Sequence, residues 1–470
     1  MVERCSLDTE REEQRRWRLL PQHAGIRDFD AMVENEFREP AELTALQAAG
    51  LRRVLQVAAD SVPYYQALFE KLAVSPQQGG DFEVLRRLPV LSKHDVQGNE
   101  AALCARKMPR GEKVYAWFQS SGTTGRATRV LHTHRSNLVF NLLVQRQFRW
   151  FRWDPMRLRG EIRNYGLLPP RADGSRQAPG AACRQDFWRY AGRFFKTGPQ
   201  AGLCATNPIE RQLAWLQETA PSYLTANASV LDRLAWFAEG KAVPDGLESV
   251  HSISEQMTET MRARVERNLG VVVNESYGLN EIGIVALRCA AGRYHVQIEH
   301  CIVEVLDDSG APCAPGTVGR LVVTGLNNFA MPLLRYETGD LAAAAEGPCP
   351  CGRSLPAFGE LVGRYRRLAG LPEDTLEKIL ALKVAVRESP VAVGDRFREY
   401  QIVQRRDGSY ELLLCVEGGP LPAGFYDWVH QCWSRKFGAD GPGLKLREVG
   451  RIPPSPSGKP LEFVSDFTSQ

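Results

Sequence analysis

Apolar residues recur at helical spacing in the first part of the chain. Across residues 41–72 they fall three or four positions apart, and Pro63 interrupts the pattern. Proline lacks the backbone N–H that a helix interior needs, so one helix must end before it and another begin. A strand pattern at 113–119 leads into a loop, and a new helical pattern begins near Ser136, which suits the N-cap position. These patterns predict a helical N-terminal layer, followed by a strand, a loop and a helix.

The middle of the chain alternates helical and extended patterns. The helical segments are 207–220, 229–240 and 257–270, and the extended segments are 221–228, 248–255 and 271–278. Such alternation is typical of parallel strands joined by crossover helices. Beyond Gly283 it gives way to the pattern of a β-meander, with an Asp-Ser-Gly turn signal at 308–310.

A second change of pattern occurs near residue 363. Beyond it the sequence predicts a helix at 372–386, a hairpin at 399–419 with an Asp407-Gly408 turn, a helix at 424–438 and a strand at 445–450. We therefore predict an α/β protein with two domains. A large domain at residues 1–362 combines parallel α/β layers with a β-rich subdomain, and a small α+β domain occupies residues 363–470.

Composition and charge narrow the class of protein. The chain has 470 residues, and 59 Lys plus Arg against 55 Asp plus Glu leave a formal net charge of +4, too little for an extended nucleic-acid surface. Residues 146–160 interleave Arg with Trp and Phe, which can stack bases, but a helix end with its aromatics in the core explains the pattern better, because no second cluster of this kind accompanies it. There is no run of about 18 apolar residues and no apolar signal segment. We therefore expect a cytoplasmic protein that binds neither nucleic acid nor membrane.

The Ser/Thr/Gly loop at 120–125 is a candidate phosphate site. Backbone N–H groups in a Gly-containing turn form a concave anion site, and hydroxyls add further donors. Gly122 and Gly125 let the main chain approach a ligand closely. No Gly-Lys-Ser/Thr follows, so the loop is not a Walker A motif, and by itself it could be a plain loop.

Further candidate residues follow in order along the chain. Tyr277 and Glu281 come just after a predicted strand, at the end where ligands of open α/β sheets bind. Asp340 follows a turn glycine and suits ribose hydroxyls, Arg364 lies at the predicted domain boundary, and Lys459 lies on a Gly-bearing loop near the C-terminus. Each of these taken alone could be a turn or surface residue.

Together these motifs resemble the acyl-adenylate-forming superfamily, and within it the phenylacetate-CoA ligase-like branch. The resemblance covers nearly the whole chain, and it implies an N-terminal adenylation domain with a mobile C-terminal lid that carries a catalytic lysine. It assigns the following residues to ATP or AMP: Ser120, Ser121, Gly122, Thr123, Thr124, Gly125, Ser254, Glu255, Tyr277, Gly278, Asp340 and Arg364. Lys459 and Glu281 would be catalytic, with Glu281 binding Mg²⁺, because charge that develops at the α-phosphate needs a metal and an ammonium to offset it.

The sequence also departs from the family pattern. Asn280 stands where the family usually has Thr or Ser before the glutamate, and Arg126 and Thr128 stand where many members have a Pro-Lys pair. The hinge reads Gly-Arg-Tyr-Arg-Arg at 363–367 and lacks the usual acidic residue. We expect this change to affect the second half-reaction more than the first.

The cysteines form a separate group. The chain has 11, an odd number, which argues for free thiols or metal ligation instead of a disulfide scaffold. Cys289, His295, Cys349 and Cys351 could bind a tetrahedral structural Zn²⁺, with free cysteines as the alternative, and the resemblance favours zinc. His300 and Cys301 are reserve ligands.

The acyl pocket is the least specified part of the site. Aromatic and basic residues around 161–197 suit an aromatic or hydroxy- or amino-substituted acid, with Tyr165 and Gly166 as lining residues, although the rings could equally be core packing.

The resemblance implies an ATP- and Mg²⁺-dependent ligase that forms an acyl-AMP, releases pyrophosphate and passes the acyl group to coenzyme A. Transfer to an amine or to a carrier-protein thiol is a second reading. A zinc-stabilised nucleotide-binding protein without catalysis is a third, kept open by Arg366 and Arg367 at the hinge. The resemblance also leaves a homodimer open.

Overall fold

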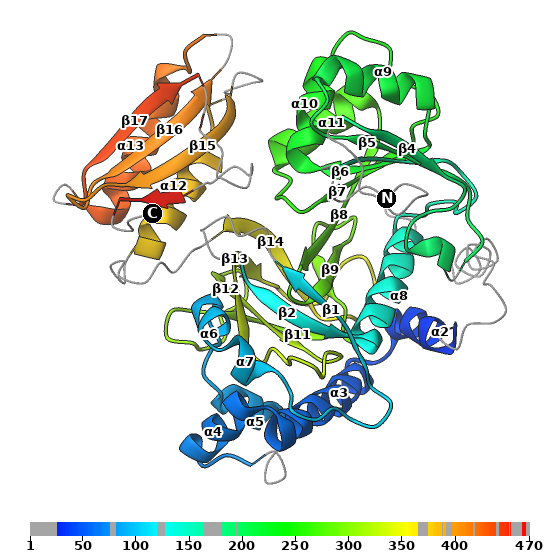
Figure 1. Cartoon of the computed structure of the whole chain (residues 1–470). Coiled ribbons are helices and arrows are strands. Elements are labelled where there is room, and N and C mark those ends of the chain that lie inside the picture. The colour runs from blue at the N-terminus through cyan, green and yellow to red at the C-terminus, as the bar shows by residue number, and fades with distance from the viewer. Residues whose placement is uncertain are drawn as a thin grey trace.

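A computed structural model shows the fold of the protein. It describes residues 26–75, 81–119, 127–163, 180–193, 195–364, 375–387, 389–391, 397–416, 419–438, 441–450, 452 and 463–466. A twelve-stranded sheet and a four-stranded sheet contain most of the strands, and a two-stranded hairpin stands beside the larger sheet. The four-stranded sheet belongs to a separate body at the upper left of Figure 1. The predicted α/β class is confirmed.

Short helices form the N-terminal layer beneath the large sheet (Figure 1). They are α2 (Ile26–Glu34), η1 (Asn35–Phe37), α3 (Pro40–Ser61), α4 (Pro63–Leu72), α5 (Asp81–Arg87), α6 (Lys93–Gly98) and α7 (Glu100–Leu103). The predicted break is confirmed, because Val62 is extended and Pro63 is the first residue of α4. Tyr65 of α4 is buried and donates a hydrogen bond to the carbonyl of Pro332, which ties this layer to the sheet.

One half of the large sheet is mainly parallel. Its strands are β3 (Arg159–Arg163), β4 (Ala182–Gln185), β5 (Gln200–Cys204), β6 (Tyr223–Asn227), β7 (Ser249–Ile253) and β8 (Val272–Leu279). All but the edge strand β4 run parallel, in the order β8-β7-β6-β3-β5. The connecting helices α9 (Ile209–Thr219), α10 (Ala228–Phe237) and α11 (Glu259–Leu269) share one apolar core with these strands. The predicted crossover arrangement is therefore confirmed.

The helix α8 (His134–Trp150) packs on the opposite face of this parallel half. Phe148 of α8 and Phe151, which follows the helix, contact Trp153, and Trp153 stacks on Tyr223 of β6. The helix is capped by Thr133, whose hydroxyl accepts the Ser136 N–H. Ser136 is therefore the third residue of the helix and not its N-cap, so the predicted N-cap was three residues late. The Arg- and Trp-rich segment at the end of α8 is largely buried, as the core-packing interpretation expects.

The other half of the sheet is an antiparallel meander, as predicted. Its strands are β9 (Gly283–Arg288), β10 (Tyr294–Val296), β11 (Cys301–Leu306), β12 (Val318–Gly325), β13 (Tyr336–Ala344) and β14 (Ala357–Arg364). The predicted turn joins β11 to β12, with Gly310 at φ +86°. β8 pairs with β7 on one side and β9 on the other, so it links the two halves.

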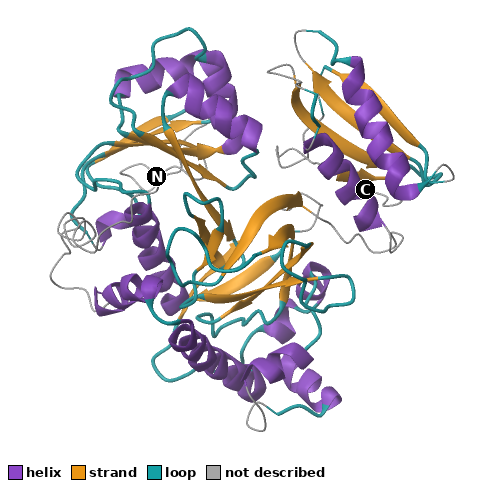
Figure 2. Ribbon diagram, turned by 180° about the vertical axis from the view of Figure 1, so that it is seen from behind, coloured by secondary structure: helices purple, strands orange, loops and turns teal. Residues whose placement is uncertain are grey.

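The described C-terminal elements have a sheet and core of their own. They are α12 (Thr375–Arg387), β15 (Phe397–Gln404), β16 (Tyr410–Val416), α13 (Ala423–Phe437), β17 (Leu444–Val449) and β18 (Phe463–Ser465). Both helices lie on one face of this sheet (Figure 2). The hairpin β15–β16 turns at Asp407 and Gly408, with Gly408 at φ +83°. The strand β14 continues to Arg364, two residues beyond the predicted domain division after residue 362. That division stays a proposal.

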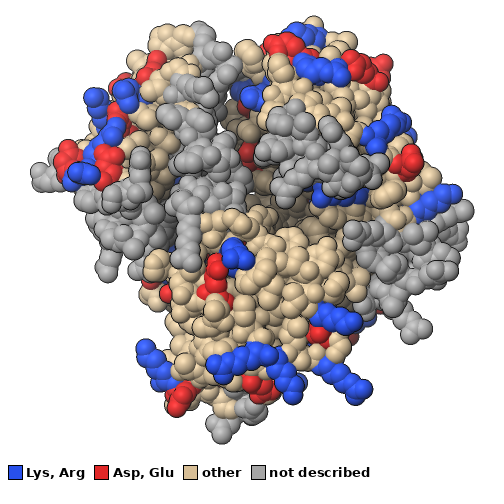
Figure 3. Space-filling model, viewed as in Figure 1, with Lys and Arg blue, Asp and Glu red and all other residues tan. Residues whose placement is uncertain are grey.

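Acidic and basic side chains are interspersed over the face shown in Figure 3. Among the described helices, none is long and apolar enough to cross a membrane.

Candidate active site

The predicted phosphate loop connects the two strands of a hairpin. β1 (Val114–Gln119) and β2 (Arg129–Thr133) are antiparallel, and Gln119 is the register partner of Arg129. The loop residues 120–126 lie outside the described residues, as do three other predicted site residues, Tyr165, Gly166 and Lys459. The hairpin nevertheless brings the two ends of the loop together, at the end of β1 and β2 that lies away from the start of α8.

Glu281 lies at this end of the sheet, in the turn between β8 and β9. Its side chain is buried, and Oε1 accepts a hydrogen bond from the Tyr336 hydroxyl at 3.2 Å. Asn280, the residue that departs from the family pattern, donates from its amide to the carbonyl of Gln119 at 3.2 Å. Asn280 therefore joins the turn that carries Glu281 to the strand end that enters the phosphate loop.

A second tyrosine–carboxylate pair lies on neighbouring elements. The Tyr277 hydroxyl donates to Oδ2 of Asp340 at 2.7 Å, and both residues are buried. Arg364 is the register partner of Asp340 across β13 and β14. Tyr277 and Asp340 are 63 positions apart in the sequence, and Asp340 and Arg364 are 24 apart. The structure thus brings all three to one end of the sheet.

The remaining described site residues have local structural roles. A side chain at Gly278 would place its Cβ 2.7 Å from the carbonyl oxygen of Gly283, so this position requires glycine. Ser254 is exposed and has a left-handed backbone, with φ +65°. Both carboxylate oxygens of Glu255 accept hydrogen bonds at the start of α10, from the Asn227 amide and the Ser229 N–H. Glu255 therefore holds the start of α10 in place, and its predicted contact with the nucleotide would be a second role.

Two buried histidines near the loop were missed in the sequence. His132 on β2 contacts the ring of Phe118, and burial, together with the nearby His300, lowers its pKa to about 4. His300 forms a 2.7 Å hydrogen bond with the carbonyl of Ile282, next to Glu281. Burial also lowers the pKa of His300, so both histidines should be neutral at pH 7. More than 160 residues separate the two histidines in the chain, so the sequence held no signal that they lie close together.

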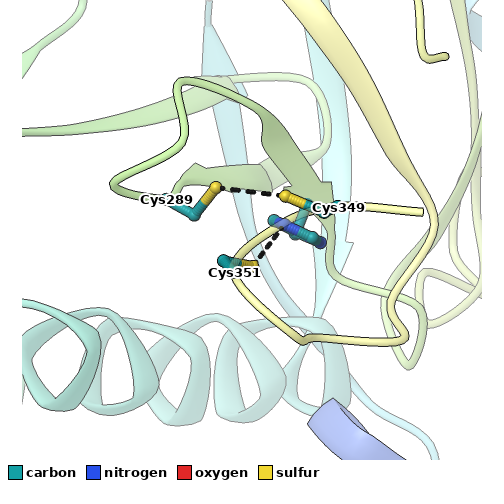
Figure 4. Close-up of side chains that lie close together, drawn as sticks. Cys289, Cys349 and Cys351 are labelled. Atoms are coloured by element: carbon teal, nitrogen blue, oxygen red, sulfur yellow. Dashed lines mark hydrogen bonds between the residues drawn. The ribbon is translucent and has the colours of Figure 1, made fainter. Parts of the chain in front are cut away.

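Three cysteines and one histidine form a compact cluster between β9, β10 and the loop before β14 (Figure 4). The sulfur atoms of Cys289, Cys349 and Cys351 and a nitrogen of His295 all lie within 4.8 Å of one another. His300 and Cys301, the reserve ligands, are not part of the cluster.

The chemistry of the cluster fits a tetrahedral metal ion. His295 Nδ1 contacts the Leu355 carbonyl at 3.0 Å, which leaves Nε2 facing Cys351 Sγ at 3.2 Å. Metal-binding histidines commonly bond their other ring nitrogen to a backbone carbonyl in this way. Hydrogen bonds from Cys289 and then from His295 lower the pKa of the Cys351 thiol well below its ordinary value. A set of three sulfurs and one imidazole suits Zn²⁺ and leaves no open position for a water.

Comparison with known proteins identifies the family. A phenylacetate-coenzyme A ligase of Thermus thermophilus is 30% identical over 384 residues, which cover 79% of this chain and 80% of that protein. The chain belongs to the phenylacetate-CoA ligase family. The Escherichia coli phenylacetate-coenzyme A ligase is 27% identical over 345 residues, covering 71% of this chain and 72% of its own. No family model matches the chain.

Solved structures agree on the fold. A 2-hydroxyisobutyryl-CoA ligase in the postadenylation state, in complex with 2-HIB-AMP, aligns with a TM-score of 0.66 at 19% identity, covering 92% of this chain and 91% of that chain. An open conformation of 2-hydroxyisobutyryl-CoA ligase in complex with 2-HIB-AMP and CoA has a TM-score of 0.61 at 17% identity, covering 92% and 93%. The resemblance to the adenylate-forming superfamily is therefore confirmed.

In this member of the family a buried carboxylate connects α8 to the cysteine cluster. Glu36 of η1 is fully buried and accepts from Arg146 at 3.1 Å, from Arg149 at 3.3 Å and from the Trp150 indole at 2.7 Å. Its other oxygen accepts from Arg353 at 3.0 Å, two residues beyond Cys351. Burial by itself raises the pKa of Glu36, but the three guanidinium groups outweigh it and leave the pKa below 4.5.

Replacing Glu36 by Gln is expected to destabilise the protein by about 3–5 kcal/mol at pH 7, because two buried guanidinium groups and the partly buried one of Arg353 lose their shared anion. Since the folded-state pKa is lowered, the stabilisation is complete above pH 4.5 and is lost as the pH falls through the folded pKa. Urea unfolding at a series of pH values from 7 downward should therefore show the difference in stability between wild type and Glu36→Gln narrowing once the pH falls below 4.5. Glu34→Gln removes a surface ion pair with Arg38 and is the control. An equal loss in both variants would contradict the role of Glu36.

Proposed function

We propose that this chain activates an aromatic carboxylic acid with ATP and transfers the acyl group to coenzyme A. The chain is an AMP-forming acid–CoA ligase, as its curated relatives and its fold indicate. Transfer to an amine or a carrier protein is not favoured, because these relatives are named as coenzyme A ligases. The same names, which specify phenylacetate, support an aromatic acid as substrate.

The observation that carries the proposal is the pair of tyrosine–carboxylate contacts beside the loop. Tyr277 orients Asp340, and Tyr336 orients Glu281, at the end of the sheet that also receives the hairpin β1–β2. Two oriented, buried carboxylates, one of them in the turn that Asn280 joins to the strand end entering the predicted phosphate loop, suit a nucleotide with its metal ion. The alternative for each carboxylate taken alone was a turn or surface residue. Such a residue would need neither burial nor a hydrogen bond from a tyrosine hydroxyl.

We assign each residue a role from its chemistry. Residues 120–125 would hold the phosphates of ATP through N–H and hydroxyl groups. Asp340 would accept hydrogen bonds from the ribose hydroxyls. Glu281 would bind Mg²⁺ through the oxygen that Tyr336 does not occupy, and the ion would neutralise phosphate charge. Lys459 would approach as a mobile point charge during adenylation.

In the first half-reaction a carboxylate oxygen of the acid attacks the α-phosphorus, and the bond to pyrophosphate breaks. In the second half-reaction the thiolate of coenzyme A attacks the acyl carbon, and AMP leaves with the electrons of the broken C–O bond. Asp340 and Tyr277 would hold the nucleotide in place through both steps, because the adenosine part does not react.

We propose that Cys289, His295, Cys349 and Cys351 bind one structural Zn²⁺. With four protein ligands the ion would hold the loop that connects β13 to β14 against β9 and β10. It takes no part in the reaction.

Acid-dependent ATP–pyrophosphate exchange tests the proposed function. We expect exchange with phenylacetate or a substituted phenylacetate, and release of AMP with thioester formation when coenzyme A is added. Aliphatic acids of similar size serve as the comparison. Absence of exchange with every acid would refute the adenylation claim, and exchange without thioester would refute the acceptor.

A further inference from the structure

His300 is a buried histidine that has no role in the proposed function so far. Its side chain is 3% exposed, and it lies at the end of the turn between β10 and β11. It is not a member of the cysteine cluster, although the sequence made it a reserve ligand. Burying a polar ring costs free energy unless the ring is hydrogen-bonded. The contacts of His300 therefore show what the ring does.

The ring of His300 holds the backbone of the turn that carries Glu281. Its Nε2 lies 2.7 Å from the carbonyl oxygen of Ile282, the residue after Glu281. A carbonyl oxygen can only accept, so Nε2 carries the hydrogen and donates it. The other ring nitrogen, Nδ1, is buried and has no partner among the residues that the structure describes. Within that part of the chain, the hydrogen bonding of the ring is directed to this one carbonyl.

The same ring packs against Gly283, the next residue of the turn. Gly283 has a φ of +112°, and a Cβ at this position would lie 3.1 Å from Nε2 of His300. It would also lie 3.4 Å from Cδ2 of Phe140 on α8. The backbone therefore approaches both rings closely, as only glycine allows here. His300 thus limits the movement of the turn by contact as well as by its hydrogen bond.

His300 is itself tied to two strands of the meander. Its backbone N–H donates to the carbonyl of Gln297 at 2.8 Å, and its carbonyl accepts from the N–H of Leu326 at 2.9 Å. Gln297 directly follows β10, and Leu326 directly follows β12. A donor that is fixed in this way also fixes the group that accepts from it. The position of the Ile282 carbonyl is therefore set by the sheet.

Three hydrogen bonds hold the turn around Glu281. The Tyr336 hydroxyl contacts the carboxylate itself, whereas Asn280 and His300 hold the chain on either side of it. A metal ligand works only when its supporting contacts keep it within about 0.5 Å of the productive position. We infer that His300 is a positioning residue for Glu281 and acts through the carbonyl of Ile282. The inference rests on the proposed function, which makes Glu281 a ligand of Mg²⁺.

The variants His300→Leu and His300→Gln test this role. Leucine removes the hydrogen bond to Ile282, whereas the amide nitrogen of glutamine can donate to the same carbonyl. The measurement is acid-dependent ATP–pyrophosphate exchange across a range of Mg²⁺ concentrations. For His300→Leu we expect the half-maximal Mg²⁺ concentration to rise about tenfold, the factor that one hydrogen bond typically supplies, and for His300→Gln to stay within about twofold of the wild type.

A loss of stability alone would give a different result. It lowers the exchange rate by the same factor at every Mg²⁺ concentration and leaves the half-maximal concentration unchanged. His251→Leu is the matched control, because His251 is also 3% exposed and has a hydrogen bond of similar length, 2.9 Å to the Ser276 hydroxyl. His251 lies on β7, and both Ser276 and its other partner, Gln147, lie outside the turn. The control should keep the Mg²⁺ requirement of the wild type.

The outcomes separate the two proposals. If the wild type supports exchange with no acid, the proposed function fails. The role of His300 is overturned, while the proposed function stands, if His300→Leu keeps the Mg²⁺ requirement of the wild type or if His300→Gln is impaired as much as His300→Leu. Loss of zinc from His300→Leu would also overturn it, because the variant would then act through the cysteine cluster. If His300→Leu does not fold, His300→Phe removes the donor, keeps a ring and is judged by the same outcomes.

Discussion

Glu281→Gln is expected to lower ATP–pyrophosphate exchange by about 10²–10³-fold, which corresponds to several kcal/mol of lost transition-state stabilisation. Glutamine has the same size and can still accept the hydrogen bond from Tyr336, so the fold and the turn should be unaffected. What it lacks is the negative charge that a hard divalent cation requires. The exchange rate measured across a range of Mg²⁺ concentrations provides the test, and more Mg²⁺ should be needed to reach half-maximal activity.

Tyr336→Phe separates the charge of Glu281 from its orientation. This variant keeps the carboxylate and removes the 3.2 Å hydrogen bond to it. We expect a loss of about tenfold, the size typical of one hydrogen bond of about 1.4 kcal/mol. If Glu281→Gln exchanges at the wild-type rate at every Mg²⁺ concentration, Glu281 is not a metal ligand.

Cys351→Ser is expected to remove the bound zinc and to lower the thermal unfolding midpoint by at least about 5 °C. A structural metal ion contributes its binding energy to folding, and a serine hydroxyl is a poor replacement for a thiolate. Elemental analysis of protein purified without chelator should find about one zinc per chain in the wild type and little in the variant. Because the loop is also held by Arg353 and Glu36, we expect a loss of stability and not complete unfolding.

Cys104→Ser is the control for the cysteine change. Cys104 is half-buried and lies outside the cluster, so its replacement should leave the zinc content unchanged. Chelation should lower the midpoint of the wild type and of the control to that of Cys351→Ser. A wild-type protein that contains no zinc would contradict the proposed site.

The amino-acid sequence by itself determined the order and type of most elements. Periodicity and proline chemistry predicted the α3–α4 break at Pro63, the alternation of α9–α11 with β6–β8, and the change to a meander after Gly283. These features depend on residues close together in the chain, so they leave a local signal. The N-cap of α8 was predicted three residues late, because Thr133 and Ser136 bond to each other at this helix start and both residue types suit an N-cap.

The sequence also supplied the candidate residues, since the motifs resemble those of a known superfamily. It could not show how they are oriented. The pairs Tyr277–Asp340 and Tyr336–Glu281 join residues more than 50 positions apart, and Asn280 reaches Gln119 across 161 positions. Loop 120–126 and Lys459 stay predictions, because they lie outside the described residues.

Tertiary structure alone decided which polar groups are paired. Composition does not reveal that Glu36 is shared by three arginines, or that neither amide atom of the buried Gln145 is paired with any residue that the structure describes. Whether a polar side chain is satisfied depends on neighbours from distant segments, and these neighbours are set by how α8 packs on the sheet. Local sequence thus determines which helices and strands form, whereas the free energy of burying charged and polar groups is settled only when those elements come together.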